Sequence, residues 1–173
     1  ERVPDASVGR RLHVDGRGVG RRSLESTSPS EWTAERAPVS NMAIDTLYGM
    51  VKRGAFAITA LDRGEFTPEN VRAAVRVLES AVQAATYMVY GIAMNDPEQQ
   101  GMGTTLSALL LREGIAITAQ VGDSRIYLVR DGKATQLTED HTLVAWQVKH
   151  GIITADEAER SPHRNVITRA VGS

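Results

Sequence analysis

The sequence predicts an α+β fold in which helices pack on an antiparallel β-sheet. Two observations predict this class. Apolar residues between positions 40 and 100 recur at helical spacing, and short apolar runs between positions 106 and 140 alternate with turn residues, which is typical of strands. Helices followed by strands, rather than alternating with them, favour α+β. A chain of 173 residues is one domain or part of a larger one.

Residues 1–40 are predicted to be a divergent or poorly ordered N-terminal segment, and residues 41–173 to be the folded domain. The first segment is rich in arginine, serine, glycine and proline. Residues 20–38 show neither a helical nor a strand period, and residues 8–13 (VGRRLH) lack the pattern of a buried strand.

Two helices are predicted in the first half of the domain. One begins at a cap formed by Ser40 or Asn41 and ends near Gly54. The other has Thr67 as its cap and Pro68 in its first position, and it ends at the Asn-Asp-Pro of residues 95–97. Its apolar residues form a single stripe: Val71, Val75, Leu78, Val82, Ala85, Val89 and Ile92.

Strands and two short helices are predicted to follow. Gly114 separates the runs LSALLLRE and IAITAQV, and Asp131-Gly132 is a hairpin turn between two further strands. A helix over residues 142–150 is stopped by Gly151, and a shorter one is capped by Thr154.

Composition excludes several classes of function. A net charge of −1 provides no general attraction to nucleic acid or to an anionic membrane. The absence of cysteine excludes disulfides, thiolate metal sites and a cysteine nucleophile. Without a long apolar run or a signal-peptide pattern, the protein is expected to be cytoplasmic and to bind neither membrane nor nucleic acid.

Asp123 stands in a Gly-Asp-Ser-Arg step directly after an apolar strand pattern. Its carboxylate could accept hydrogen bonds from backbone amides, or it could bind a hard metal ion such as Mg²⁺ or Mn²⁺. A single aspartate does not decide between these roles.

Asp123 lies in the second of four motifs that follow one another along the sequence. They are GMGTT (101–105), VGDSRIYLVRDGK (121–133), QLTEDHTLV (136–144) and HGIITADEAERSPHRNVITRAVG (150–172). This arrangement resembles the PPM, or protein phosphatase 2C, family of metal-dependent serine/threonine phosphatases in its bacterial form. The resemblance implies an antiparallel β-sandwich flanked by helices, of which this chain would hold an incomplete part.

The resemblance also implies a chemistry and a site. Two or three Mn²⁺ or Mg²⁺ ions would activate water for attack on phosphoserine or phosphothreonine, in a bacterial signalling circuit that includes a serine/threonine kinase or its targets. Asp123 matches a metal-binding aspartate, and residues 142–165 resemble a flap that borders the site. Asp140 and His141 match a structural Asp-His step, in which His141 would serve either a local hydrogen bond or proton transfer.

The N-terminal matches are less complete. Asp15 and Gly16 match an Asp-Gly pair that contacts metal, Asp5 could be a further metal aspartate, and Arg2 could bind the substrate phosphate. The residues after Gly16 depart from the family pattern and the expected histidine is missing, so a flexible glycine loop is an equal alternative. Further aspartates expected downstream have no counterpart before Ser173. The alternative function is therefore a catalytically inactive module or fragment that binds a phosphoprotein, a kinase or a completing partner chain.

Overall fold

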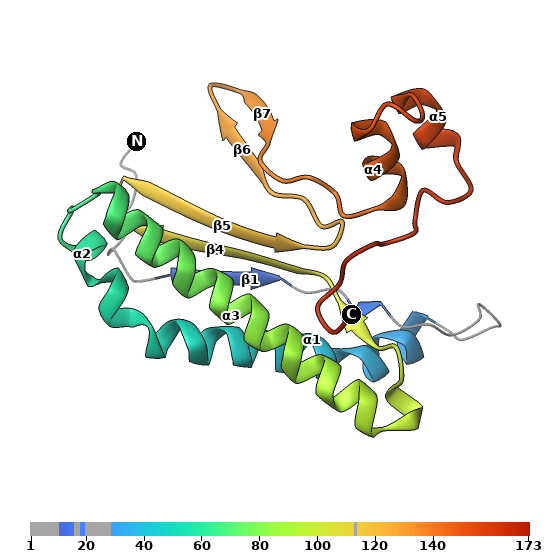
Figure 1. The fold of residues 1–173 in the computed structure, drawn as a ribbon, viewed down its shortest axis with the longest axis horizontal. Coiled ribbons are helices and arrows are strands. Elements are labelled where there is room, and N and C mark those ends of the chain that lie inside the picture. The colour runs from blue at the N-terminus through green and yellow to red at the C-terminus, as the bar shows by residue number, and fades with distance from the viewer. Residues whose placement is uncertain (1–10, 16–17, 20–28, 113) are drawn as a thin grey trace.

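The computed structural model describes residues 11–15, 18–19, 29–112 and 114–173, and it arranges two long helices along one face of a sheet (Figure 1). The sheet is antiparallel with strand order β1-β4-β5. The strands are β1 (Arg11–Asp15), β4 (Leu106–Arg112) and β5 (Ile115–Val121), and the helices are α1 (Pro29–Arg53) and α3 (Pro68–Asn95). This arrangement confirms the α+β prediction.

Helix α3 follows the sequence prediction at both ends. The Thr67 hydroxyl accepts the backbone N–H of Asn70 at 3.3 Å, and Pro68 occupies the first helical position, where its missing N–H leaves no bond unmade. Leu78, Ala85 and Val89 of the predicted stripe are buried. Ala74 and Ala81 are buried beside them, and their small side chains let the neighbouring layers approach closely.

Helix α1 ends at Arg53, as predicted, but begins at Pro29 and not at Ser40. The loop interpretation is therefore wrong for residues 29–40. That segment contains few large apolar residues, so it carries no visible period. It also contains Pro38, which normally interrupts a helix.

Strand β1 corrects a second expectation about the N-terminal segment. Its residues pair antiparallel with β4, from Arg11 opposite Leu111 to Asp15 opposite Ser107. Within the described sheet, β1 has one neighbouring strand only. An edge strand tolerates charged residues that a central strand would exclude, so the absence of a buried-strand pattern does not exclude a strand here.

The remaining elements are short. Gly54 leads into η1 (Ala55–Ile58) and α2 (Thr59–Asp62), and η2 (Pro97–Gln99) leads from α3 to β3 (Gly103–Thr104), which pairs with β2 (Gly18–Val19). The hairpin β6 (Tyr127–Arg130) and β7 (Lys133–Gln136) turns at Asp131-Gly132, both with positive φ, as predicted. Helix α4 (Leu143–Lys149) lies within the predicted span 142–150 and is capped by Thr142, and helix α5 (Ala155–Arg160) has the predicted cap, Thr154.

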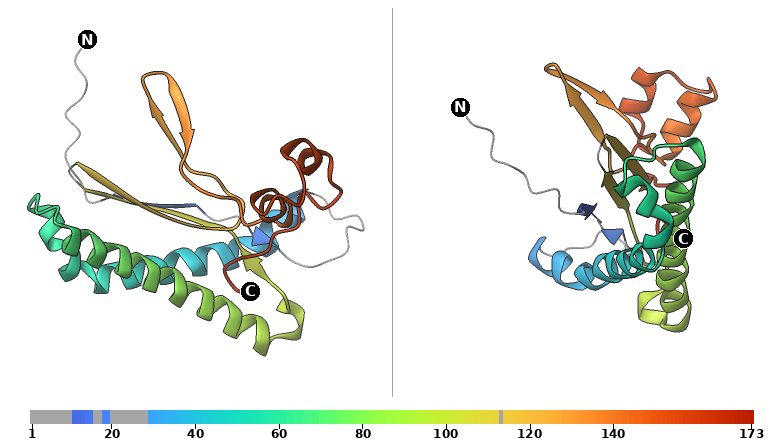
Figure 2. Two further views of the ribbon diagram at one scale, coloured as in Figure 1. Left: turned by 45° about the horizontal axis from the view of Figure 1, so that its top comes forward. Right: turned by 90° about the vertical axis from the view of Figure 1, so that its left-hand side faces the viewer.

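The core lies between the helix pair and the sheet. Leu47 of α1, Leu78 of α3, and Leu106 and Leu110 of β4 are essentially inaccessible to solvent and belong to one apolar cluster. The hairpin β6-β7 and the pair α4-α5 contribute no residue to this cluster, and Figure 1 shows both above the sheet with α1 and α3 below it. Figure 2 shows the hairpin projecting away from the two long helices. No helix in the described part of the chain is long and apolar enough to cross a lipid bilayer.

Candidate functional site

The register of the sheet brings two predicted metal ligands to the same end of the sheet. Asp15, the last residue of β1, lies opposite Ser107 of β4, and Ser107 lies opposite Gln120 of β5. Asp123 stands in the turn that directly follows β5. Two aspartates that are far apart in the sequence therefore lie at the same end of the sheet, with β4 between their strands.

The turn that carries Asp123 is packed tightly against the chain before β4. Gly122 has a φ of +102°, and a Cβ atom at this position would lie 2.4 Å from Cγ2 of Thr105. The Thr105 and Ser124 hydroxyl oxygens are 3.1 Å apart, within hydrogen-bonding distance. Only glycine fits both the backbone conformation and the close approach.

His141 holds the same turn from a second side. Its backbone N–H donates to the Gly122 carbonyl at 2.9 Å, and the Gly122 N–H donates to the imidazole Nδ1 at 3.1 Å. The Gln120 side-chain amide also donates to the Gly122 carbonyl. A nitrogen that accepts an N–H carries no proton of its own. His141 therefore serves the local hydrogen-bonding role, one of its two predicted roles.

The surroundings of His141 favour this neutral form. Partial burial lowers the pKa of His141 below its ordinary value, and the positive charge of Arg169 lowers it further. Glu139 and Asp140 oppose that shift without reversing it. The imidazole thus stays neutral over a wider pH range than an exposed histidine would.

Asp140 is engaged by Arg125 and is not free to bind a metal. The guanidinium donates through Nε and Nη2 to the two carboxylate oxygens, with distances of 2.9 Å to Oδ1 and 2.6 Å to Oδ2. The hydrogen bonds with Asp140 raise the pKa of Arg125 above its ordinary value. Asp123, in contrast, is exposed and makes no hydrogen bond or ion pair with any other described residue.

The described residues fit a hard metal ion in kind but not in number. Carboxylate oxygens are the ligands that Mg²⁺ and Mn²⁺ prefer, and several must converge on one ion. Among the residues that the structure describes, no three acidic, histidine or cysteine side chains lie close enough to hold a metal. Asp123 and Asp15 would thus supply part of a ligand set. Three of the predicted site residues, Arg2, Asp5 and Gly16, lie outside the described residues.

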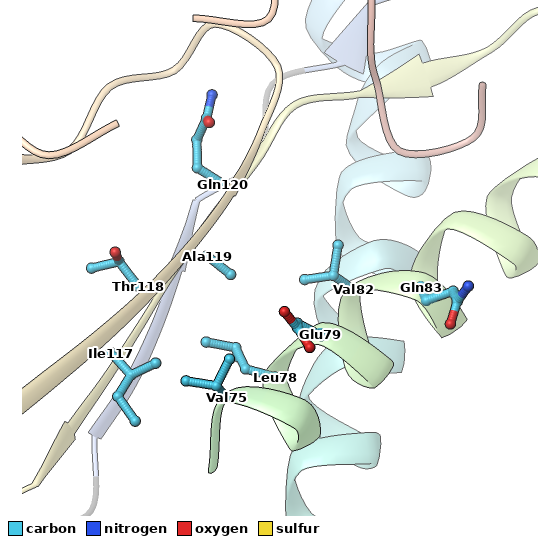
Figure 3. Close-up of a pocket in the computed structure, with 9 residues that line it drawn as sticks. All are labelled: Val75, Leu78, Glu79, Val82, Gln83, Ile117, Thr118, Ala119 and Gln120. Carbon is cyan, nitrogen blue, oxygen red and sulfur yellow. The ribbon is translucent and has the colours of Figure 1, made fainter. Parts of the chain in front are cut away.

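A groove between α3 and β5 has the wrong chemistry for a phosphate site (Figure 3). Its volume is about 510 Å³, and its walls are largely apolar, with Leu78 and Val82 on the helix and Ile117 on the strand. Glu79 is the only ionisable residue that lines it. The groove thus offers neither a cationic side chain for phosphate nor a second carboxylate for a metal ion. The end of the sheet that carries Asp123 remains the candidate site.

Comparison with known proteins identifies the group to which this chain belongs. A sequence model described as protein phosphatase 2C matches residues 58–145, just over half of the chain. The chain belongs to the protein phosphatase 2C family. It is 45% identical over 95 residues to a putative protein phosphatase 2C-type of Streptococcus pyogenes, and 43% identical over 94 residues to the serine/threonine protein phosphatase PstP of Mycobacterium tuberculosis.

The protein phosphatase 2C chain spans only part of these relatives. The matches cover 55% and 54% of the present chain, but 38% of the streptococcal protein and 18% of the mycobacterial one.

Solved structures confirm the predicted fold family. The serine/threonine phosphatase Stp1 of Staphylococcus aureus superposes with a TM-score of 0.70 at 26% identity, covering 96% of this chain and 56% of the other. The catalytic domain of PstP in complex with two manganese ions superposes with a TM-score of 0.61 at 30% identity, covering 95% of this chain and 57% of that one.

Sequence reasoning did not identify two residues that shape the site of this protein phosphatase 2C chain. Thr105 packs against Gly122 in the turn that carries Asp123. Thr168 holds His141, because its N–H donates to the His141 carbonyl at 2.8 Å. Both stand within the quoted motifs, but a threonine in a motif carries no sign of which distant backbone it contacts.

Proposed function

We propose that this chain is part of a metal-dependent phosphatase that hydrolyses phosphoserine and phosphothreonine in proteins. The observation that carries the proposal is the register β1-β4-β5, which brings Asp15 and Asp123 to one end of the sheet in a chain of the protein phosphatase 2C family. The Asp15 and Asp123 carboxylates and the Gly16 carbonyl would contribute metal ligands. Asp5 would supply a further carboxylate.

The chemistry requires no nucleophile from the protein. Bound Mn²⁺ or Mg²⁺ would lower the pKa of a coordinated water and neutralise negative charge on the transferring phosphoryl group. The chain's own task is to hold oxygen ligands at this end of the sheet and to orient the phosphate, for which Arg2 is the proposed residue. The remaining ligands would come from parts of the site beyond the described residues.

The substrate and partners follow from the same proposal. The relative from M. tuberculosis is named a serine/threonine protein phosphatase, which supports a phosphorylated protein as substrate. We propose that a serine/threonine kinase or its targets supply it, in bacterial cytoplasmic signalling. Residues 142–165, which contain α4 and α5, would act as the flap that borders the substrate.

The test is hydrolysis of p-nitrophenyl phosphate and of a phosphothreonine peptide while Mn²⁺ is titrated. Asp123→Asn and Asp15→Asn remove one carboxylate each with little change in shape. Both variants should need more Mn²⁺ for the same rate and should lose about tenfold or more in turnover. Asp131→Asn, in the exposed β6-β7 turn, is the matched control and should behave as the parent chain. Metal-independent turnover, or equal turnover in all variants, would overturn the proposal.

A binding module is the second candidate, favoured by the lack of a three-ligand cluster among the described residues. In that case the folded chain would show no turnover at any Mn²⁺ concentration. It would still bind a fluorescent phosphothreonine peptide more tightly than the unphosphorylated peptide, as measured by anisotropy.

A further inference from the structure

The backbone of Gly122, the residue directly before Asp123, is held by two hydrogen bonds to one residue, His141. The His141 N–H donates to the Gly122 carbonyl at 2.9 Å, and the Gly122 N–H donates to Nδ1 of the His141 ring at 3.1 Å. Both polar backbone groups of Gly122 are thus satisfied by the same neighbour. We propose that His141 is a positioning residue that sets the direction of the Asp123 carboxylate. This inference rests on the proposed role of Asp123 as a metal ligand.

His141 is itself anchored on both sides, so it can act as a rigid support. Its carbonyl accepts the Thr168 N–H at 2.8 Å, and the following residue, Thr142, forms a β-bridge with Ile167. The preceding residue, Asp140, is held by the Arg125 guanidinium through three hydrogen bonds. The support therefore ties the turn after β5 to the segment that follows α5.

Asp123 depends on the restraint of its backbone, which His141 shares with the contacts of Gly122 with Thr105 and Gln120. The side chain is exposed and has no partner among the described residues, so its direction is inherited from the backbone before it. That backbone belongs to glycine, which has the widest conformational freedom of any residue. Loss of the acceptor at Nδ1 would leave the Gly122 N–H unpaired and would release the Val121-Gly122 peptide, whose orientation helps to fix the backbone that leads to Asp123.

The proposed role needs an acceptor at the position of Nδ1 and does not need an imidazole. The side-chain oxygen of asparagine occupies nearly the same place as Nδ1 of histidine and also accepts an N–H. His141→Asn should therefore preserve the positioning, whereas His141→Ala should abolish it. His163→Ala is the matched control, because His163 is exposed and its ring makes no hydrogen bond to a described residue.

The first measurement is amide hydrogen exchange of Gly122 in the full metal-free chain, followed by NMR. His141→Ala should speed exchange at Gly122 by about tenfold relative to amides in the centre of β4, and His141→Asn should restore most of the protection. His163→Ala should leave the rate unchanged. Equal exchange at Gly122 in parent and His141→Ala would overturn the positioning role.

The second measurement is Mn²⁺ affinity by electron paramagnetic resonance in a double-mutant cycle. His141→Ala should weaken binding by about tenfold when Asp123 is present and should have no effect in an Asp123→Asn background. The same loss in both backgrounds, or no recovery in His141→Asn, would show that His141 only stabilises the fold. If no variant binds Mn²⁺, the proposed metal role of Asp123 fails, while the exchange experiment still decides whether His141 orders the turn.

Discussion

Gly122 shows at the scale of a single residue how the end of the sheet is built. Its positive φ and its contact with Thr105 both exclude a side chain. Gly122→Ala should therefore destabilise the chain by more than the roughly 1–2 kcal/mol that a left-handed conformation costs an ordinary residue. Gly132→Ala separates the two causes, because Gly132 also has a positive φ but open space around its Cβ position. Urea unfolding should show the larger loss for Gly122→Ala, and equal losses would contradict the close approach.

His141 predicts a pH dependence of stability. Its pKa in the folded chain lies below the ordinary value of 6.5, so the unfolded chain binds more protons between the folded pKa and 6.5. The stability that His141 contributes is therefore fully present above pH 6.5. It is lost as the pH falls from 6.5 to the pKa of His141 in the folded chain. Arg169 strengthens the effect, and Glu139 and Asp140 weaken it.

The measurement is the free energy of unfolding between pH 5 and pH 8 for the parent chain and for His141→Asn. Asparagine does not titrate, so the variant should lose less stability toward low pH than the parent. Identical pH profiles would show that His141 has the same pKa in the folded and unfolded chains.

At the scale of the element, α3 shows how one helical face supports the fold. Leu78 is 2% exposed and belongs to the core cluster that also holds residues of α1 and of the sheet, whereas Tyr87 is 67% exposed. Leu78→Ala should cost about 3 kcal/mol, since it removes buried methyl groups and leaves a cavity. Tyr87→Ala should change the stability by less than about 0.5 kcal/mol. Thermal or urea unfolding measures both, and comparable losses would mean that α3 does not pack as described.

At the scale of the whole molecule, the last described residues return to the helix pair. Val171 is fully buried, and its N–H and carbonyl exchange hydrogen bonds of 2.8 and 3.0 Å with Thr104 of β3. A Cβ atom on the next residue, Gly172, would lie 2.3 Å from Cγ1 of Val89 in α3. This return ties the segment that contains α4 and α5 to the main core.

Val171→Ala tests that closure. The loss of two buried methyl groups should cost about 2 kcal/mol. Val129→Ala, at a position that is 69% exposed in β6, is the matched control and should be nearly neutral. The two free energies of unfolding are compared in urea, and a neutral Val171→Ala would mean that residues near the C-terminus are not docked as described.

The sequence by itself determined the elements whose signals are local. Thr67 and Pro68 mark the start of α3, Asp131-Gly132 marks a hairpin turn, and Thr154 caps α5, because each acts on backbone groups within a few residues. Four motifs indicated the family, and the Gly-Asp step marked Asp123 as a candidate ligand.

Only the tertiary structure decided where these parts meet. Strand β1 and the first turns of α1 lack an apolar period, and β1 forms because β4 offers it hydrogen-bonding partners. That pairing also places Asp15 at the end of the sheet that carries Asp123. The contacts of Gly122 with Thr105 and His141 join residues that are distant in sequence. Such contacts depend on packing and strand register, which no local pattern encodes.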